Sequence, residues 1–180
     1  MAEVKADLTE MYKLMRMLKT DYTVRIGILG GKATAQHKGS ELTNADIGSF
    51  HEFGGTSKNG KPQPPQRSFL MMPISSKLNF NQDEMKNMRK LLFKQLFIKK
   101  SVEDFYKGLL SKALEVVNNC FATGGFGEWK PLAAITYARR SAKLPKRVTK
   151  RSLTYWFNHP ILTDTGQLRR SISGKIIKGK

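Results

Sequence analysis

Residues 43–55 read TNADIGSFHEFGG, and residues 64–70, which follow a polar loop, read PPQRSFL. Thr43 or Asn44 can cap a helix, because each side chain can accept a hydrogen bond from a free backbone amide of the first turn. Gly54 can end that helix in the left-handed backbone conformation, which residues with a Cβ atom resist. The pattern therefore predicts a short helix that ends at a glycine pair.

The predicted helix has one apolar face. Ile47, Phe50 and Phe53 recur at three-residue spacing, so their side chains share one side of the helix and must pack on larger structure. The loop that follows is rich in turn-forming residues, and the two prolines after it force the chain to extend. A strand is therefore predicted from Ser68 to Met72, and Pro73 is expected to end it.

Five further elements follow from periodicity and capping. Apolar residues at helical spacing predict a helix over residues 7–19, and alternation with period two predicts a half-buried strand over residues 22–29. Residues 83–100 and 101–121 are predicted helices, and the second begins at a capping signature and is expected to form the core. A last strand is expected over residues 173–177.

Three segments, in a fixed order along the chain, carry a resemblance to a known family. They are HEFG at 51–54 with PQRSFL at 65–70, then WKPL at 129–132 followed by Thr136 and Arg139, and finally LTDTGQLRRSI at 162–172. Together they resemble the tailed-bacteriophage virion morphogenesis proteins, the tail-completion or neck family. The chain departs from this pattern in its long loop after Gly55, in Ser68 where proline is expected, and in residues 77–100, which match no part of it.

The resemblance implies a structural virion protein that is assembled in the host cytoplasm and forms a ring at the head-tail junction, or neck, or at the tail end. It would complete tail assembly or head-tail joining there. Its expected partners are further copies of itself, neighbouring phage neck, connector or tail proteins, and packaged double-stranded DNA. The residues predicted to lie at the subunit interface are Phe50, Phe53, Arg67, Phe69, Trp129 and Leu132.

The expected fold is α+β, with a small antiparallel sheet packed against a long helix and with extended loops and arms. Residues 1–180 are interpreted as a single domain, since this length supports one good core. Residues 54–66 and 124–151 are interpreted as assembly arms because of their composition. The low apolar fraction, 39%, also favours surfaces that are buried only in an assembly.

The net charge of +18 is unevenly distributed. No acidic residue lies between Trp129 and Thr163, and such a field attracts polyanions. A second basic run, from Lys86 to Lys100, overlaps residues 91–97, which are apolar on too many sides for a solvated helix and indicate packing or a subunit contact. Each run alone could be a solvated basic surface. The residues predicted to contact DNA or an acidic partner are Arg139, Arg140, Lys143, Lys146, Arg147, Lys150 and Arg151.

We expect no metal, no cofactor and no enzymatic activity. Cys120 is the only cysteine, and the three histidines have no carboxylate or cysteine at metal-ligand spacing. His51 and Glu52 lack a third partner for acid-base work. The glycines of residues 27–32 precede a lysine, but their spacing does not fit a phosphate-binding loop, so residues 30–42 are interpreted as a polar loop. The sequence shows no signal peptide and no membrane-spanning run.

Two other classes of protein remain as alternatives. A stand-alone basic nucleic-acid-binding module fits the charge, but the chain lacks the signatures of the common modules. A toxin or nuclease would need carboxylate clusters for a metal ion, and the sequence shows none. The virion protein is therefore the preferred interpretation.

Overall fold

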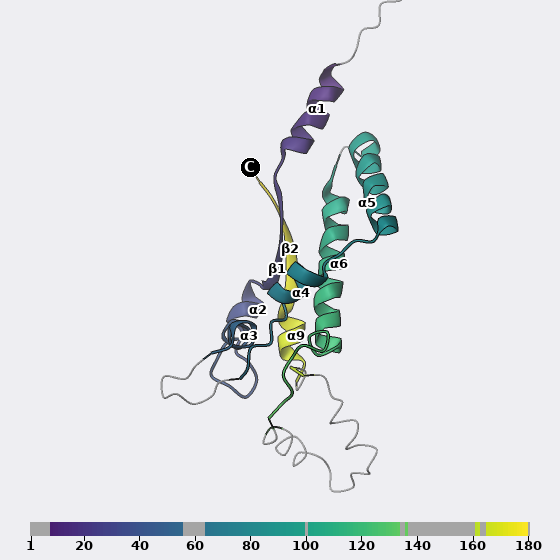
Figure 1. The fold of residues 1–180 in the computed structure, drawn as a ribbon. Coiled ribbons are helices and arrows are strands. Elements are labelled where there is room, and N and C mark those ends of the chain that lie inside the picture. The colour runs from purple at the N-terminus through teal and green to yellow at the C-terminus, as the bar shows by residue number, and fades with distance from the viewer. Residues whose placement is uncertain are drawn as a thin grey trace, which may run out of the picture. The chain divides into compact units, whose positions relative to one another are not determined.

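The computed structural model describes residues 8–55, 64–99, 101–133, 136, 161–162 and 165–179. The fold is α+β, as predicted: a two-stranded antiparallel sheet packs against helices (Figure 1). In chain order the elements are α1 (Leu8–Lys19), β1 (Tyr22–Ile28), α2 (Gly31–Thr34), α3 (Asn44–Phe53), α4 (Met71–Lys77), α5 (Gln82–Lys94), the π-helix η1 (Gln95–Lys99), α6 (Glu103–Ala122), α9 (Gln167–Ser171) and β2 (Ile172–Lys178).

The contacts within the chain group it into two compact units. Unit 1 is formed by Met1–Ile26, Leu78–Leu114 and Gly174–Lys180, and unit 2 by Gly27–Lys77 and Glu115–Ser173. Each unit therefore combines segments that are far apart in the sequence.

In unit 1, β2 lies close to α6. A Cβ atom added to Gly174 of β2 would collide with the side chain of Leu110 of α6, so glycine is the residue that permits this approach. The rings of Tyr22 from β1 and Tyr106 from α6 stack with their centroids 4.7 Å apart. Glu84 of α5 pairs with Lys112 of α6 at 2.7 Å.

In unit 2, the C-terminal turns of α6 supply three of the six buried core residues. Phe121 is fully buried, and its ring lies 5.3 Å from that of Phe69 and 5.7 Å from that of Trp129, measured between centroids. The buried core of this unit consists of Phe69, Val117, Cys120, Phe121, Trp129 and Leu168. The predictions of a core helix and of a buried Cys120 are thus confirmed.

The capping prediction for α3 is confirmed. Thr43 accepts a hydrogen bond from the Asp46 amide, and the Asp46 side chain accepts one from the Thr43 amide, which completes a capping box. Asn81 and Glu84 form the same reciprocal pair at the start of α5. The predicted helix over residues 83–100 continues as the π-helix η1 after Lys94.

Two local predictions are wrong. The chain forms no strand from Ser68 to Met72; it enters α4 at Met71, and Pro73 lies buried in the first turn. Proline is tolerated there because amides of the first helical turn have no partner within the helix. The polar loop predicted over residues 30–42 contains the one-turn helix α2 and an antiparallel bridge between Gln36 and Thr43.

Candidate functional site

The candidate site is a framework of hydrogen bonds in unit 2, and Glu52 lies at its centre. Glu52 is in the last turn of α3 and only 5% exposed. One carboxylate oxygen accepts hydrogen bonds from the backbone amides of Phe69 at 2.8 Å and Leu70 at 3.0 Å. The other accepts from the Met71 amide at 2.8 Å and from the Ser68 hydroxyl at 2.5 Å.

Glu52 therefore caps α4 from another helix. The first amides of a helix lack partners within it and carry partial positive charge, so a carboxylate there stabilises the helix. The Ser68 hydroxyl adds a local contact, because it accepts a hydrogen bond from the Met72 amide at 2.9 Å. These bonds explain why a helix begins where the prolines and the sequence pattern predicted a strand.

Arg67 joins the same segment to the chain that follows α6. Its guanidinium is buried, and Nε and Nη2 donate to the carbonyl oxygen of Lys130 at 3.2 and 3.1 Å. Nη2 also donates to the carbonyl oxygen of Pro131 at 3.2 Å. The Arg67 amide donates to the carbonyl oxygen of His51 at 2.7 Å, which ties this residue to α3 as well.

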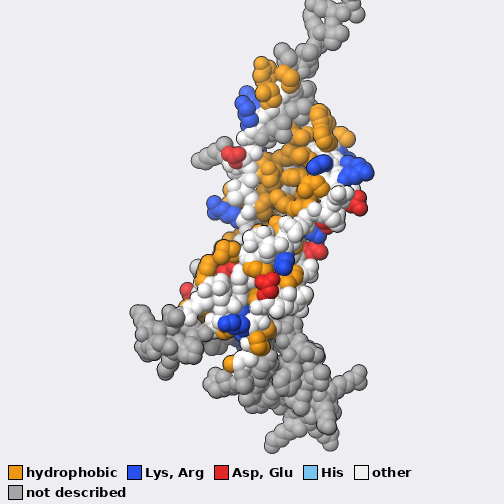
Figure 2. All heavy atoms as spheres, viewed as in Figure 1, with side chains coloured by type: hydrophobic (Ala, Val, Ile, Leu, Met, Phe, Trp, Pro, Cys, Tyr) orange, Lys and Arg blue, Asp and Glu red, His pale blue; other side chains and the backbone are white. Residues whose placement is uncertain are grey.

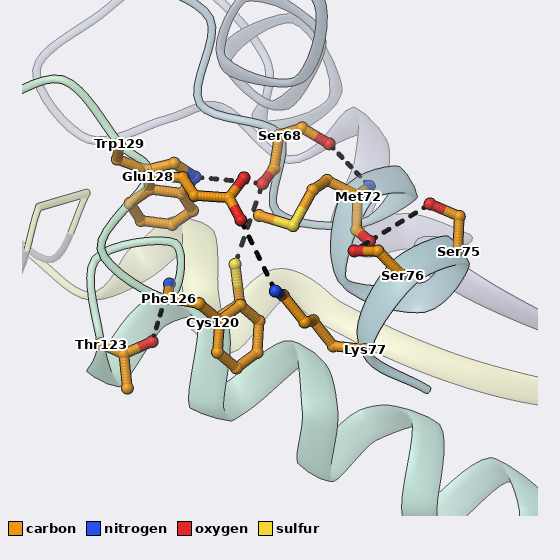
Figure 3. A network of polar contacts seen from close by, with 10 residues as sticks. All are labelled: Ser68, Met72, Ser75, Ser76, Lys77, Cys120, Thr123, Phe126, Glu128 and Trp129. Atoms are coloured by element: carbon orange, nitrogen blue, oxygen red, sulfur yellow. Dashed lines mark hydrogen bonds and ion pairs between the residues drawn. The ribbon is translucent and has the colours of Figure 1, made fainter. Parts of the chain in front are cut away.

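Trp129 contacts the segment that leads into α4 (Figure 3). Its Nε1 donates to the carbonyl oxygen of Ser68 at 3.1 Å, and the Cys120 thiol approaches the same oxygen at 3.8 Å. Lys77 lies 3.6 Å from the Glu128 carboxylate, and its ammonium is 5.5 Å from the ring centroid of Phe126. The turn after α6 is thus packed against α4 and the residues before it, within unit 2.

The segment that begins α9 reaches the start of α3. Gln167 Nε2 donates to Asn44 Oδ1 at 3.0 Å and to the carbonyl oxygen of Gln36 at 2.9 Å. Gln167 Oε1 accepts from the Lys38 amide at 2.9 Å. Leu168 is 4% exposed and belongs to the core of unit 2. The three sequence segments that carry the family resemblance therefore meet in the core of unit 2, where they contribute Phe69, Trp129 and Leu168.

The predicted interface residues differ in their exposure. Phe50 and Phe53 on α3 are 39% and 66% exposed, so their side chains are accessible at the surface of this chain. Phe69, Arg67 and Trp129 are buried within this chain, where the core and the framework occupy their side chains. Leu132 is half-buried.

The predicted basic contacts lie elsewhere in the chain. Arg139, Arg140, Lys143, Lys146, Arg147, Lys150 and Arg151 are outside the described residues, so their contact with DNA or an acidic partner stays a prediction. Of the two predicted arms, the structure describes residues 54–55, 64–66, 124–133 and 136.

Two titratable side chains near the framework, His51 and Cys120, have pKa values shifted toward their neutral forms. Burial, followed by the positive charges of Arg67 and His37, lowers the pKa of His51 to about 4. His51 Nδ1 is buried and has no hydrogen-bond partner among the described residues. Burial is also the main reason that the pKa of Cys120 is raised to about 12. Within the described part of the chain no three metal-ligating side chains cluster.

The role of Glu52 was missed from the sequence, which paired it only with His51. One signal was present: a carboxylate in the last turn of a helix is unfavourably placed against the helix dipole and calls for compensating donors. Which donors supply that compensation could not be read from the sequence, because they lie about 17 to 19 residues away. The bridging role of Gln167 was missed as well.

No family model, curated protein or solved structure matches this chain. The resemblance to phage neck proteins thus depends on the chain's own residues. Among the described residues, no helix combines the length and the apolar character that a membrane span requires.

Proposed function

We propose that this chain is a structural virion protein of a tailed phage and that it forms a ring at the head-tail junction or at the tail end. One observation carries the proposal. Residues of the three segments that resemble the tail-completion family share one buried core, to which they contribute Phe69, Trp129 and Leu168, and Arg67 also joins the first segment to the second by hydrogen bonds. Such joint structural use supports the view that they form one pattern rather than three chance matches.

The exposed face of α3 supports assembly into a ring. Phe53 and Phe50 expose large apolar side chains directly before the long loop that begins at Gly54. In a cyclic ring a patch on one subunit meets a different patch on its neighbour, and exposed aromatic side chains are common anchors of such interfaces. The charge of +18 would face packaged DNA or acidic neighbouring proteins.

The decisive test is electron microscopy of a lysate from which only this chain is absent. Full heads with separate tails would support a role in joining, and overlong or abnormal tails would support tail termination. Normal joined particles would overturn the proposal.

A matched pair of variants tests the interface. Phe53→Ser should reduce infectious particles because it removes an exposed aromatic ring from the proposed contact. Met71→Ser is the control, since Met71 in the same unit is 57% exposed and lies on α4. Equal particle yields for the two variants would argue against a subunit contact at Phe53.

A stand-alone nucleic-acid-binding module is the second candidate, and the charge of +18 favours it. Such a protein would bind DNA tightly at moderate salt, and its affinity would fall log-linearly with added salt. Weak DNA binding by the purified chain at moderate salt would remove this candidate.

A further inference from the structure

One face of α5 combines cations with large apolar side chains. Figure 2 shows hydrophobic side chains beside a group of Lys and Arg side chains in the part of the molecule that Figure 1 labels α5. A depression of about 670 Å³ lies on this face of unit 1. We call the surface that lines this depression the α5 face. The residues that define the α5 face are Phe80, Met85, Lys86, Arg89, Lys90 and Phe93.

The cations of the α5 face are not neutralised within the described chain. Lys86, Arg89 and Lys90 are exposed, and none has an ion pair or side-chain hydrogen bond with another described residue. Asp83 also lines the depression, whereas Glu84 on the same helix is engaged with Lys112 at 2.7 Å. The face therefore keeps an excess of positive charge.

Apolar side chains continue from the α5 face into η1. Phe93 and Phe97 are each 62% exposed, and their rings stack with centroids 6.1 Å apart. Ile98 is 71% exposed, because the π-helix buries Gln95 and Leu96 and leaves the next two side chains outside. Clustered exposed apolar side chains of this size are typical of a surface that binds a partner.

The mixture of charges and apolar groups decides between possible partners. Duplex DNA would pair its phosphates with the cations but would offer little to Phe97 or Ile98. A second copy of this chain would offer few carboxylates to these cations, since each copy has 14 acidic residues and 32 basic ones. A helix with acidic residues beside an apolar stripe satisfies both parts of the face, because its carboxylates pair with the cations and its stripe covers the rings.

We propose that the α5 face binds an acidic amphipathic helix of another protein. The helix would lay its apolar stripe against Met85, Phe93 and Phe97 and place carboxylates beside the cations. This inference goes beyond the proposed function, since residues 77–100 lie outside the segments that carry the family resemblance.

The probe is a fluorescent 18-residue peptide with leucine at helical spacing and glutamate elsewhere, and fluorescence anisotropy measures its binding to the full chain at 150 mM salt. The test variant reverses three charges, Lys86→Glu, Arg89→Glu and Lys90→Glu. The control makes the same charge change at other exposed positions of unit 1, Lys19→Glu, Arg25→Glu and Lys175→Glu. We expect the test variant to lose at least tenfold in affinity and the control to lose less than threefold.

Two further measurements separate docking from charge attraction. Phe97→Ser should weaken binding of the amphipathic peptide about fivefold, while its melting temperature stays that of the wild type because the ring is exposed. A scrambled peptide of equal composition should bind at least tenfold more weakly than the probe. Equal losses in the two charge variants, or equal binding of the scrambled peptide, would overturn the proposal.

The same titration with a 20-base-pair DNA duplex and with phosphatidylglycerol vesicles identifies a different occupant. If either ligand binds more tightly than the peptide and loses that affinity through Lys86→Glu, Arg89→Glu and Lys90→Glu, the α5 face is a phosphate or membrane surface and the proposal is wrong. The test uses purified chain and no particles, so its outcome is independent of the phage phenotype.

Discussion

Glu52 accepts a hydrogen bond from the backbone amide of Met71 at 2.8 Å, across 19 positions of sequence. The same carboxylate accepts the amides of Phe69 and Leu70, so it serves three consecutive donors at the start of α4. A buried carboxylate needs this number of partners to offset the free energy lost when it leaves water. The end of α3 is thereby fixed to the start of α4 within unit 2.

Replacement of Glu52 tests this connection. Glu52→Ala leaves three amides and the Ser68 hydroxyl without their acceptor, so we expect the free energy of unfolding to fall by about 3 kcal/mol or more. Glu52→Gln should have a smaller effect, because the glutamine side chain keeps one acceptor oxygen. Some destabilisation should remain, because its NH2 group would face backbone amides that are also donors. Guanidinium denaturation measures both changes.

The control for this experiment is Glu128→Gln. Glu128 pairs with Lys77 at 3.6 Å, but its side chain is 56% exposed, and exposed ion pairs contribute under about 1 kcal/mol. If Glu52→Ala destabilised the protein no more than this control, the capping role of Glu52 would be refuted.

The close approach of Gly125 and Trp129 yields a second prediction. Gly125 has φ 74°, and a Cβ atom there would collide with the indole of Trp129. Gly125→Ala should therefore cost the strain of the left-handed conformation, about 1 kcal/mol, and an overpacking penalty of roughly 1–3 kcal/mol. Thermal unfolding followed by circular dichroism measures the total.

Gly127 provides the comparison, because its φ is 85° and a Cβ atom added there would meet no neighbouring heavy atom within 4 Å. Gly127→Ala carries the strain alone, so its melting temperature should fall less than that of Gly125→Ala. Equal losses would show that the indole moves aside without cost.

Local patterns were enough to predict most of the elements, while contacts between distant residues were not predictable. The capping box at Thr43 and Asp46 lies within four residues, so the sequence contains it completely. The start of α4 depends on Glu52, which no local pattern links to it. The sequence also could not show which of the predicted interface aromatics the chain buries in its own core: Phe53 is exposed, whereas Phe69 is buried.

Cys120 provides a third prediction. Burial raises the pKa of its thiol to about 12, so at pH 8 the group is a protonated thiol shielded by the core of unit 2. We expect Ellman's reagent to label the native protein far more slowly than protein in 6 M guanidinium, where labelling should be immediate. Because Cys120 is the only cysteine, the rate reports opening of this core alone. Stoichiometric labelling of native protein within seconds would contradict its buried position.

His51 provides the last prediction, which concerns pH. Its pKa is lowered to about 4 in the folded chain, first by burial and then by Arg67 and His37, against an ordinary value of 6.5. The unfolded chain therefore binds a proton more readily, and the stability that the neutral imidazole contributes is present above pH 6.5 and is lost as the pH falls toward 4. The full difference corresponds to about 3 kcal/mol. In His51→Gln this part of the acid destabilisation should disappear.

Denaturation at several pH values between 7 and 4 measures this difference. Other groups also titrate in this range, so the informative quantity is the loss of stability in the wild type minus the loss in His51→Gln. That difference should approach about 3 kcal/mol, and a difference near zero would refute the prediction. NMR titration of the imidazole provides a direct check. A pKa near 6.5 for His51 would contradict its burial and its proximity to the charge of Arg67.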